Sequence, residues 1–469
     1  MVEDKIIDKA PVTLKEQKVN DVKIKNSLNS ESDKATQPPE SAAETVLDPS
    51  CDEKNPRIIS FQDVCQAAFM IKGGIDFTPC RRSHLSEQSG IEIFLKKEFQ
   101  QYTGSFKERG ARNFLLHLTP EQKKNGVVSA SLGNHALGLS YHGMKLKIPV
   151  TVVMPKEAPI MKVQKCRSFG AHVLIQGEDM AAAKKIAMEI SRDKKTPYVN
   201  GYDHPLIISG QGTIGLEIVE QCEGADAIVV PVGGGGLIAG IATAIKTLSP
   251  QTKIIGVESN KCPSFSKALQ HGGPVYTPNL ATLADGLAVP KVGCNAYATV
   301  KPLLDRMIVV KEEWIALAIL RLVEMEKCVV EGAGAAGLAA ILAGQLDEFK
   351  GKKVVLLVCG GNIDTTTFGR CLERGLAAEG RLMKFNVTVS DRPGGITELC
   401  RLISSIGVTI KDIMHERAWL KDIYCVEVKC VVETADFDHS QQLKKKLMEN
   451  YKNVFFNEPS FAIHKSAAF

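Results

Sequence analysis

Residues 227–239 carry the sequence AIVVPVGGGGLIA, and this stretch decides the fold class. An uninterrupted apolar run of this length is typical of a strand buried on both faces of a parallel sheet. The glycines Gly233–Gly236 follow the run and lead directly into an Ala/Ile segment of helical character. Because glycine backbone can wrap an anion and a helix start adds N–H donors, the loop predicts a phosphate site.

Similar apolar runs recur on both sides of this stretch, at 150–154, 253–257 and 354–358. Ala-rich helical segments separate them, which indicates a parallel sheet with helices on both faces. We therefore expect an α/β catalytic domain over residues 56–380. Residues 1–55 contain no aromatic residue and are rich in charged and small polar residues, so they predict a disordered tail.

The composition narrows the class of protein. The 469 residues are 44% hydrophobic and 24% charged, as in an ordinary globular protein, and the net charge of +5 is too scattered to favour nucleic acid. The longest apolar stretches fall short of the roughly 20 residues of a membrane span. The 13 dispersed cysteines lack metal-ligand spacing and favour a reducing compartment, so we expect a cytoplasmic protein without membrane partners.

Residues 381–469 follow a different pattern. Apolar and polar residues alternate from Phe385 to Val389, the sequence of 391–395 (DRPGG) is a turn, and Ile396, Leu399 and Ile403 recur at helical spacing. Two further strands, a helix and a final strand are expected by the same reasoning. The order βαββαβ predicts a ferredoxin-like unit.

The sequence of 104–110, GSFKERG, contains the main catalytic candidate. Ser105 and Glu108 have the spacing of a capping box, which predicts a helix that begins around Phe106. Lys107 then lies in the first turn, where the helix dipole disfavours positive charge and lowers the pKa of an amine. Such a lysine suits imine formation. The plain alternative is a solvated helix start.

Residues 131–138, SLGNHALG, follow a short apolar run and open a helix. Their N–H groups and Ser131 could hold a carboxylate, and Asn134 could donate to a phenolate oxygen. An ordinary Asn/Gly loop with a packed His135 remains the alternative. A second alternative arises from Gly234-x-Gly236-x-x-Ala239, which together with Glu258 fits a loose dinucleotide-binding fingerprint. A nicotinamide-dependent oxidoreductase therefore remains an alternative function.

Six windows in order within residues 57–377 resemble the threonine/serine dehydratase family of pyridoxal-phosphate enzymes, which includes serine racemase. They are GSFKERGA (104–111), SLGNHALG (131–138), GGGGL (233–237), TLADGLAV (282–289), VEGAGAAG (330–337) and CGGN (359–362). The resemblance implies the two-subdomain, tryptophan-synthase-β-like fold (fold type II) of these enzymes and pyridoxal 5′-phosphate as the cofactor.

The resemblance also implies a role for each matched residue. Lys107 would carry the cofactor as an imine and abstract the substrate's α-proton, with Phe106 beside the pyridine ring and Asn134 on its O3′. Cys359 would face the ring nitrogen. The substrate carboxylate would be held by the loop of Ser131, Leu132, Gly133, Asn134 and His135. The phosphate would be cradled by the backbone of Gly233, Gly234, Gly235, Gly236 and Leu237.

The implied reaction is β-elimination of L-threonine or L-serine to 2-oxobutyrate or pyruvate and ammonia, with the cofactor phosphate as the acid for the leaving hydroxyl. Leu132 stands where a racemase resemblance expects a second serine, so racemisation should be weak. Ser264 stands where some relatives have a metal-binding aspartate after Glu258, so no metal is expected. A serine racemase-like enzyme, a nicotinamide oxidoreductase and a non-catalytic amino-acid sensor remain alternatives.

Residues 383–457 resemble an ACT domain, through DRPGGITEL (391–399) and the βαββαβ order. ACT domains typically bind amino acids between paired copies. The resemblance implies an amino-acid effector and a homo-oligomer, dimer or tetramer. An RNA-binding unit is the rival, but the aromatic strand motif of an RRM is missing.

Overall fold

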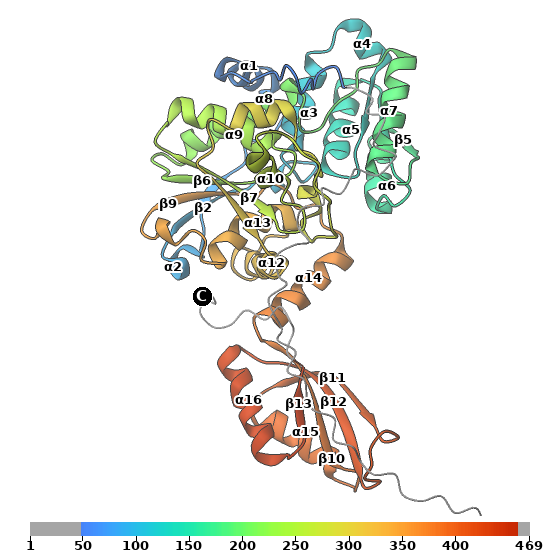
Figure 1. Ribbon diagram of the computed structural model, residues 1–469, viewed down its shortest axis with the longest axis vertical. Coiled ribbons are helices and arrows are strands. Elements are labelled where there is room, and N and C mark those ends of the chain that lie inside the picture. Colours follow the sequence, from blue (N-terminus) through green and yellow to red (C-terminus); the bar gives the residue numbers. More distant parts are fainter. Residues whose placement is uncertain (1–47, 458–469) are drawn as a thin grey trace, which may run out of the picture.

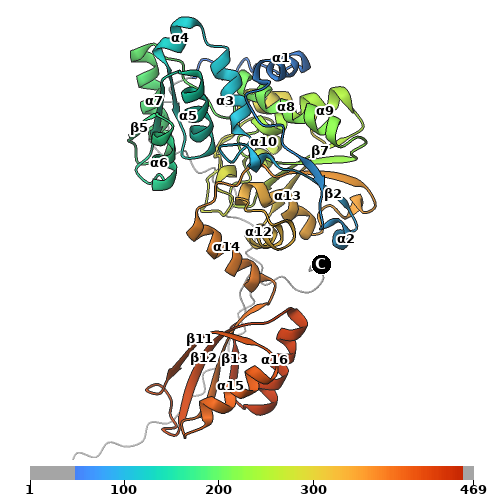
Figure 2. The same ribbon diagram turned by 180° about the vertical axis from the view of Figure 1, so that it is seen from behind.

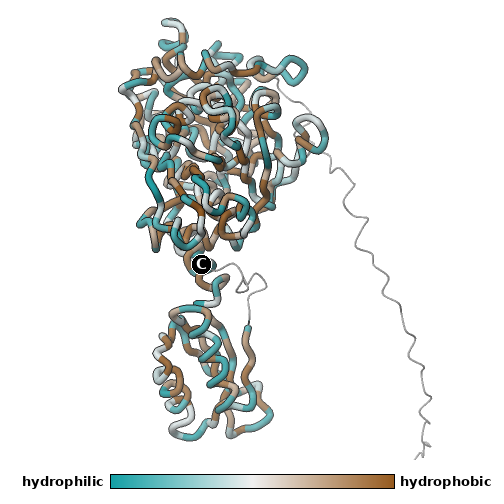
Figure 3. Tube along the Cα trace, turned by 90° about the vertical axis from the view of Figure 1, so that its left-hand side faces the viewer, coloured by the Kyte–Doolittle hydropathy of each residue, from teal (hydrophilic) through white to brown (hydrophobic). Residues whose placement is uncertain are grey.

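The computed structural model describes residues 48–457. Figure 1 shows a large α/β body and a smaller body of strands and two helices, joined through α14 (Thr365–Ala378). In Figure 3 apolar segments run through both bodies, and each has its own buried core. No helix among residues 48–457 is both long and apolar enough to span a membrane.

The main sheet of the large body has six strands in the order β1-β2-β9-β6-β7-β8. All pairs are parallel except β1 with β2. The strands are β1 (Cys80–Arg82), β2 (Glu92–Lys96), β9 (Lys353–Leu357), β6 (Ala227–Pro231), β7 (Lys253–Ser259) and β8 (Arg306–Val310). Every residue of β6 is buried, so the apolar run at 227–231 is a central strand as its composition predicts.

Helices cover both faces of this sheet. In Figures 1 and 2, α8 (Pro205–Gln221) and α9 (Gly236–Leu248) lie on one side, and α12 (Glu312–Glu326) and α13 (Gly332–Leu342) lie on the other. Seven further elements of the described residues belong to this part. They are α1 (Phe61–Ile71), α2 (Ser86–Ser89), α10 (Ser264–His271), α11 (Cys294–Val300) and the 3₁₀ turns η2 (Glu98–Gln100), η3 (Asp285–Leu287) and η4 (Asp347–Phe349).

A second parallel sheet, in the order β3-β4-β5, forms a smaller subdomain of the large body with its own apolar cluster. Figure 2 shows its helices beside it. Its elements are β3 (Val127–Ala130), β4 (Val150–Met154), β5 (His172–Ile175), α3 (Lys107–Leu116), α4 (Pro120–Asn125), α5 (Asn134–Leu146), α6 (Ile160–Ser168) and α7 (Met180–Lys194). Two parallel sheets in two subdomains confirm the predicted fold class.

The C-terminal body is a four-stranded antiparallel sheet in the order β11-β12-β10-β13. Its chain order is β10 (Leu382–Ser390), α15 (Gly395–Ser405), β11 (Thr409–Glu416), β12 (Cys425–Glu433), α16 (Phe437–Asn450) and β13 (Val454–Phe456). This is the βαββαβ order of a ferredoxin-like unit, as the sequence predicts. Alternate residues of β10 are buried, which matches a strand with one face on the core.

Residues 1–47 of the expected tail lie outside the described residues. The following residues contact the large body: the side-chain amide of Asn295 donates to Ser50 O at 2.7 Å and its oxygen accepts from Arg57 N at 2.7 Å. Asp48 is buried. The chain ahead of residue 56 therefore includes a segment that packs on α11.

Candidate active site

Side chains from several elements converge where parallel strands of the two sheets end. The loop after β3 begins at Ser131, the glycine loop follows β6, and Cys359 follows β9. Phe106 N donates to Cys359 O at 3.1 Å, which fixes the start of α3 beside the end of β9. The carboxyl ends of parallel strands are the usual binding edge of α/β sheets.

Lys107 is the first residue of α3, and its Nζ donates to Gly201 O at 2.6 Å. Burial lowers the pKa of this lysine to about 8, although the nearby Cys359 and Glu331 act in the opposite direction. An amine with this pKa is partly neutral near physiological pH. Lys107 can therefore act as a nucleophile towards a carbonyl and as a base.

The capping box expected at Ser105 and Glu108 is wrong. Glu108 accepts a hydrogen bond from Thr103 N and pairs with His142 Nε2 at 3.0 Å, and Ser105 Oγ has no partner within residues 48–457. The helix begins at Lys107 with Phe106 as its N-cap residue, and that residue makes no side-chain cap. The Glu108 carboxylate, which the local pattern assigned to the helix cap, is therefore bonded to His142 of α5 instead.

Two positions of the glycine loop have no room for a side chain. A Cβ at Gly234 would lie 2.3 Å from the Tyr202 ring, and one at Gly236 would lie 2.1 Å from Tyr202 O. Gly235 has φ 93°, which favours glycine, and it caps α9 without a side-chain hydrogen bond. The first N–H groups of α9 are thus left to a ligand, and a phosphate fits this cradle.

Asn134 lies in a network that sequence analysis did not find. Its Nδ2 donates to Glu331 Oε1 at 2.7 Å, and its Oδ1 accepts from Asn362 Nδ2 at 2.9 Å. Glu331 is buried, and burial, with a contribution from Asp285, raises its pKa to about 7. One signal in the sequence could have identified Glu331. It is the single carboxylate in the otherwise Gly/Ala/Val run VEGAGAAG (330–337), and a carboxylate buried in such a run without a salt bridge is expected to have a raised pKa.

The loop after β3 folds back on itself. Ser131 Oγ accepts from Gly133 N and from Ala136 N, each at 3.3 Å, and Leu132 is partly exposed. His135 is buried, and burial with the nearby Lys107 lowers its pKa to about 3, so the ring is neutral. These contacts favour a packed His135 over one that carries charge.

Two further candidates lie beside Lys107. The Phe106 ring is buried, with its centroid 5.1 Å from Lys107 Nζ. Cys359 is also buried, and burial together with Glu331 raises the pKa of its thiol well above the ordinary value. The thiol is therefore neutral and can face a ring nitrogen without a charge.

Glu258 is occupied by backbone groups. Its two oxygens accept from Phe265 N and Ser266 N, each at 2.9 Å, so that the carboxylate caps the start of α10. The neighbouring Ser264 provides a hydroxyl where metal-binding relatives are expected to have a carboxylate. Across residues 48–457 we find no cluster of three His, Cys, Asp or Glu side chains with the geometry of a metal site.

Comparisons with known proteins agree on the family. The model of the family described as pyridoxal-phosphate dependent enzyme matches residues 71–360. An L-threonine ammonia-lyase of Thermotoga maritima is 41% identical over 393 residues, which are 83% of this chain and 98% of the relative. Another, from Geobacter sulfurreducens, is 43% identical over 77% of this chain and 90% of its own length.

Solved structures with the same fold include two at 33% identity. The processed form of threonine deaminase isoform 2 from Solanum lycopersicum has a TM-score of 0.64, covering 70% of this chain and 98% of its own. Serine racemase from Dictyostelium discoideum has a TM-score of 0.62 and covers 65% and 99%.

Proposed function

The chain belongs to the pyridoxal-phosphate-dependent enzymes of the threonine/serine dehydratase type. From that premise we propose that it catalyses the β-elimination of L-threonine or L-serine and that an amino acid regulates this activity. The products are 2-oxobutyrate or pyruvate, and ammonia. The observation that carries the proposal is Lys107, a buried amine with a pKa of about 8 that directly follows Phe106, whose N–H is bonded to Cys359 O after β9.

The residues present fit the cofactor. The backbone of Gly233–Gly236 and Leu237 would hold its phosphate, Phe106 would pack on its ring, and Asn134 and Cys359 would contact its polar atoms. When bound, pyridoxal phosphate supplies an electron-withdrawing ring that stabilises negative charge at the substrate's α-carbon. The neutral Cys359 thiol moderates this effect, which suits elimination.

The chain's own residues then act on the substrate. The N–H groups of the Ser131 loop would bind the carboxylate, and Lys107 Nζ would accept the α-proton. Glu331 would orient Asn134 through the 2.7 Å hydrogen bond. Leu132 has no proton to give on the opposite side of the substrate, so elimination is favoured over racemisation.

The direct test is release of 2-oxo acid from L-threonine and L-serine by the full chain and by Lys107→Ala. We expect the variant to lose turnover together with the visible absorbance of the lysine-bound cofactor. The conservative Lys107→Arg keeps the charge but cannot form the bond, and we expect it to behave in the same way. An unchanged rate and spectrum in either variant would show that another residue carries the chemistry.

The C-terminal body supports the regulatory part of the proposal. It has its own core, and every catalytic candidate lies in the range 106–359. A tight turn joins β10 to α15: a Cβ at Gly395 would lie 2.0 Å from Ser390 O, while Gly394 has φ 108° and open space around it. Such a turn lets the charged ends of a small amino acid approach the backbone. Paired copies in a homo-oligomer would transmit its binding to the active sites.

A further inference from the structure

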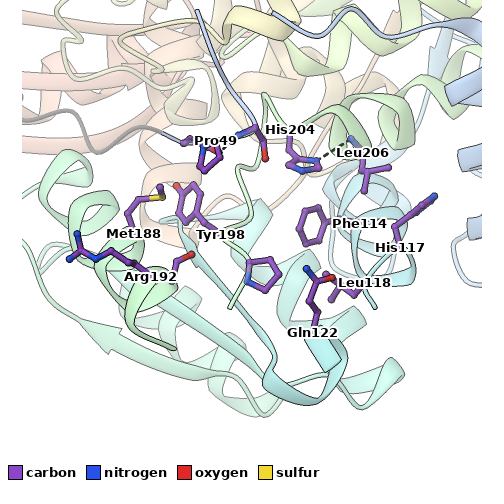
Figure 4. Close-up of a pocket in the computed structure, with 14 residues that line it drawn as sticks. Pro49, Phe114, His117, Leu118, Gln122, Met188, Arg192, Tyr198, His204 and Leu206 are labelled. Carbon is purple, nitrogen blue, oxygen red and sulfur yellow. Dashed lines mark hydrogen bonds between the residues drawn. The ribbon is translucent and has the colours of Figure 1, made fainter. Parts of the chain in front are cut away.

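A cavity of about 610 Å³ lies at the C-terminal end of α3, whereas Lys107 lies at the start of that helix. Figure 4 shows the side chains that line it. Its volume lies within the range of about 300–1,000 Å³ that small-molecule sites usually have. None of the residues assigned to the reaction lines it. The lining residues are Asp48, Pro49, Ser50, Phe114, His117, Leu118, Gln122, Met188, Ser191, Arg192, Pro197, Tyr198, His204 and Leu206.

The walls of the cavity are largely apolar. Figure 4 shows the rings of Tyr198 and Phe114 on opposite sides of the space, and buried Leu118 and Met188 also line it. The Phe114 and His204 rings meet edge to face, with centroids 4.8 Å apart. Such walls suit a flat or branched apolar group.

Two polar side chains of the lining, His204 and Gln122, present donors to the cavity. His204 Nδ1 accepts from Leu206 N at 3.1 Å, so the neutral ring carries its proton on Nε2. Burial lowers the pKa of His204 to about 4, which keeps the ring neutral. Gln122 accepts from Thr119 N through its oxygen, which leaves its NH₂ group to donate.

The cavity lining carries one acidic and one basic residue, Asp48 and Arg192. Asp48 is the only acidic residue in the lining, and its carboxylate already accepts from Ser50 N at 3.0 Å and Asn200 Nδ2 at 3.2 Å. Arg192 lies at the rim with its side chain 73% exposed, and its Nε pairs with the exposed Asp193 at 3.5 Å, a pair that a ligand anion can exchange for its own. The donors on His204 and Gln122, together with the guanidinium at the rim, can bind the acceptor oxygens of a carboxylate.

Both walls of the cavity belong to segments that also hold Lys107. Phe114 lies seven residues after Lys107 on α3, about 10 Å along a helix. The segment 197–206 contributes Tyr198 and His204 to the cavity and Gly201 O to the Lys107 amine. The two segments are joined by the 2.8 Å hydrogen bond from Asn113 Nδ2 to Leu206 O.

We propose that this cavity is a second ligand site, which takes a small organic carboxylate with an apolar or aromatic body and is coupled to Lys107. A ligand between Tyr198 and Phe114 contacts both segments that position the lysine. Its binding therefore shifts these two segments relative to each other and changes the surroundings of the Lys107 nitrogen. This site is separate from the amino-acid site proposed for the C-terminal body.

The test uses indole-3-propionate as the probe, because it has an aromatic body and a carboxylate but no amino group to react at the active site. Calorimetric titration of the full holoenzyme should show one site per chain. Leu118→Trp, which fills the cavity, should weaken binding by at least about tenfold. Arg192→Gln should weaken it by about 2- to 5-fold, as expected for an exposed charge pair. Lys194→Gln, an exposed neighbour on α7, should leave it unchanged.

The neutral amide, indole-3-propanamide, separates charge from shape and should bind more weakly than the acid. Equal affinity for acid and amide would overturn the anionic assignment. Absent binding, or binding that survives both Leu118→Trp and Arg192→Gln, would overturn the site; if the tryptophan variant fails to fold, the arginine variant and the amide still decide.

Coupling is measured as the effect of the probe on the pH titration of the lysine-bound cofactor's absorbance. We expect a shift of the midpoint that Leu118→Trp abolishes. A titration identical with and without saturating probe would refute the coupling. Since neither readout requires elimination of water from an amino acid, failure here is distinct from failure of the proposed lyase activity.

Discussion

Replacing Glu331 with glutamine should remove a pH-dependent loss of stability from the catalytic body. Burial raises the pKa of this carboxyl from 4.5 to about 7, so the folded chain holds its proton more tightly than the unfolded chain does. Stability falls with pH wherever the folded state binds more protons. The effect is absent below pH 4.5, grows as pH rises towards 7, and is constant above that value.

The magnitude follows from the two pKa values. At about 1.4 kcal/mol for each pH unit, titration between 4.5 and about 7 costs the wild type about 3 kcal/mol of unfolding free energy. Glu331→Gln has no charge to bury, and its side-chain oxygen can still accept from Asn134 Nδ2. The variant should therefore unfold at nearly the same denaturant concentration as the wild type at pH 4.5, and at a clearly higher one at pH 8.

The assay is urea unfolding of the cofactor-free chain at several pH values. The chain has two tryptophans, and Trp419 is 87% exposed in the C-terminal body, so a Trp419→Phe background leaves Trp314 on α12 as the reporter of the catalytic body. Glu121→Gln, an exposed carboxylate on α4, is the matched control. Parallel stability curves for wild type and Glu331→Gln from pH 4.5 to 8 would refute the argument that burial sets this pKa.

Three further predictions concern the cofactor, the reaction and its regulation. Gly235→Val should lower cofactor occupancy, read from absorbance, more than it lowers secondary structure, because residue 235 has φ 93° and a Cβ there would lie 3.1 Å from the Phe265 ring and 3.2 Å from Ala296 Cβ. Full occupancy would count against the phosphate cradle. L-Serine should give pyruvate with little D-serine, and Leu132→Ser should raise the D-serine fraction measured by chiral chromatography; a wild type that racemises as fast as it eliminates would show that a second proton donor was missed. In the full chain, isoleucine, valine, threonine or serine should shift the apparent substrate affinity by about 5- to 150-fold. A chain ending after Arg381 should keep its turnover and lose this shift, and a response that survives truncation would place the sensor elsewhere.

Truncation at this point keeps the ion pairs that join the end of α14 to α12. Arg381 Nη1 pairs with Glu324 at 2.7 Å, and Glu379 pairs with Arg321, so the end of α14 is tied to α12. An earlier end, near Ala377, would break these pairs and expose partly buried charges. The boundary therefore matters to the experiment even though all the catalytic candidates precede it.

Much of the fold could be predicted from sequence because its signals are local. A strand such as β6 must be apolar along its whole length, since helices cover both faces of the sheet. The glycines after it are required because Tyr202 lies too close for a side chain at Gly234 or Gly236. The alternation in β10 records a single buried face in the same way. These constraints act on neighbouring residues, so one sequence is sufficient to find them.

The failed predictions concern partners that are distant in sequence. The spacing of Ser105 and Glu108 is correct for a capping box, yet His142, 34 residues beyond the glutamate, takes one of its oxygens. A helix cap contributes about 1 kcal/mol. The buried, charge-assisted hydrogen bond between Glu108 and His142 contributes about 1.5–3 kcal/mol, so it outweighs the cap.

Glu331 illustrates the same limit at the active site. Its amide partner, Asn134, is 197 residues away, and the two meet only because β3 and the helix α13 reach the same place from different subdomains. Sequence identifies residue types that can do chemistry, but the pKa that decides their protonation is set by burial, which depends on the assembled fold. Lys107 shows the consequence. Its lowered pKa was expected from its place at the helix start, whereas desolvation by burial is the largest cause. Variants that loosen the packing around Gly201 should therefore raise the pKa of the amine more than changes to the helix cap do.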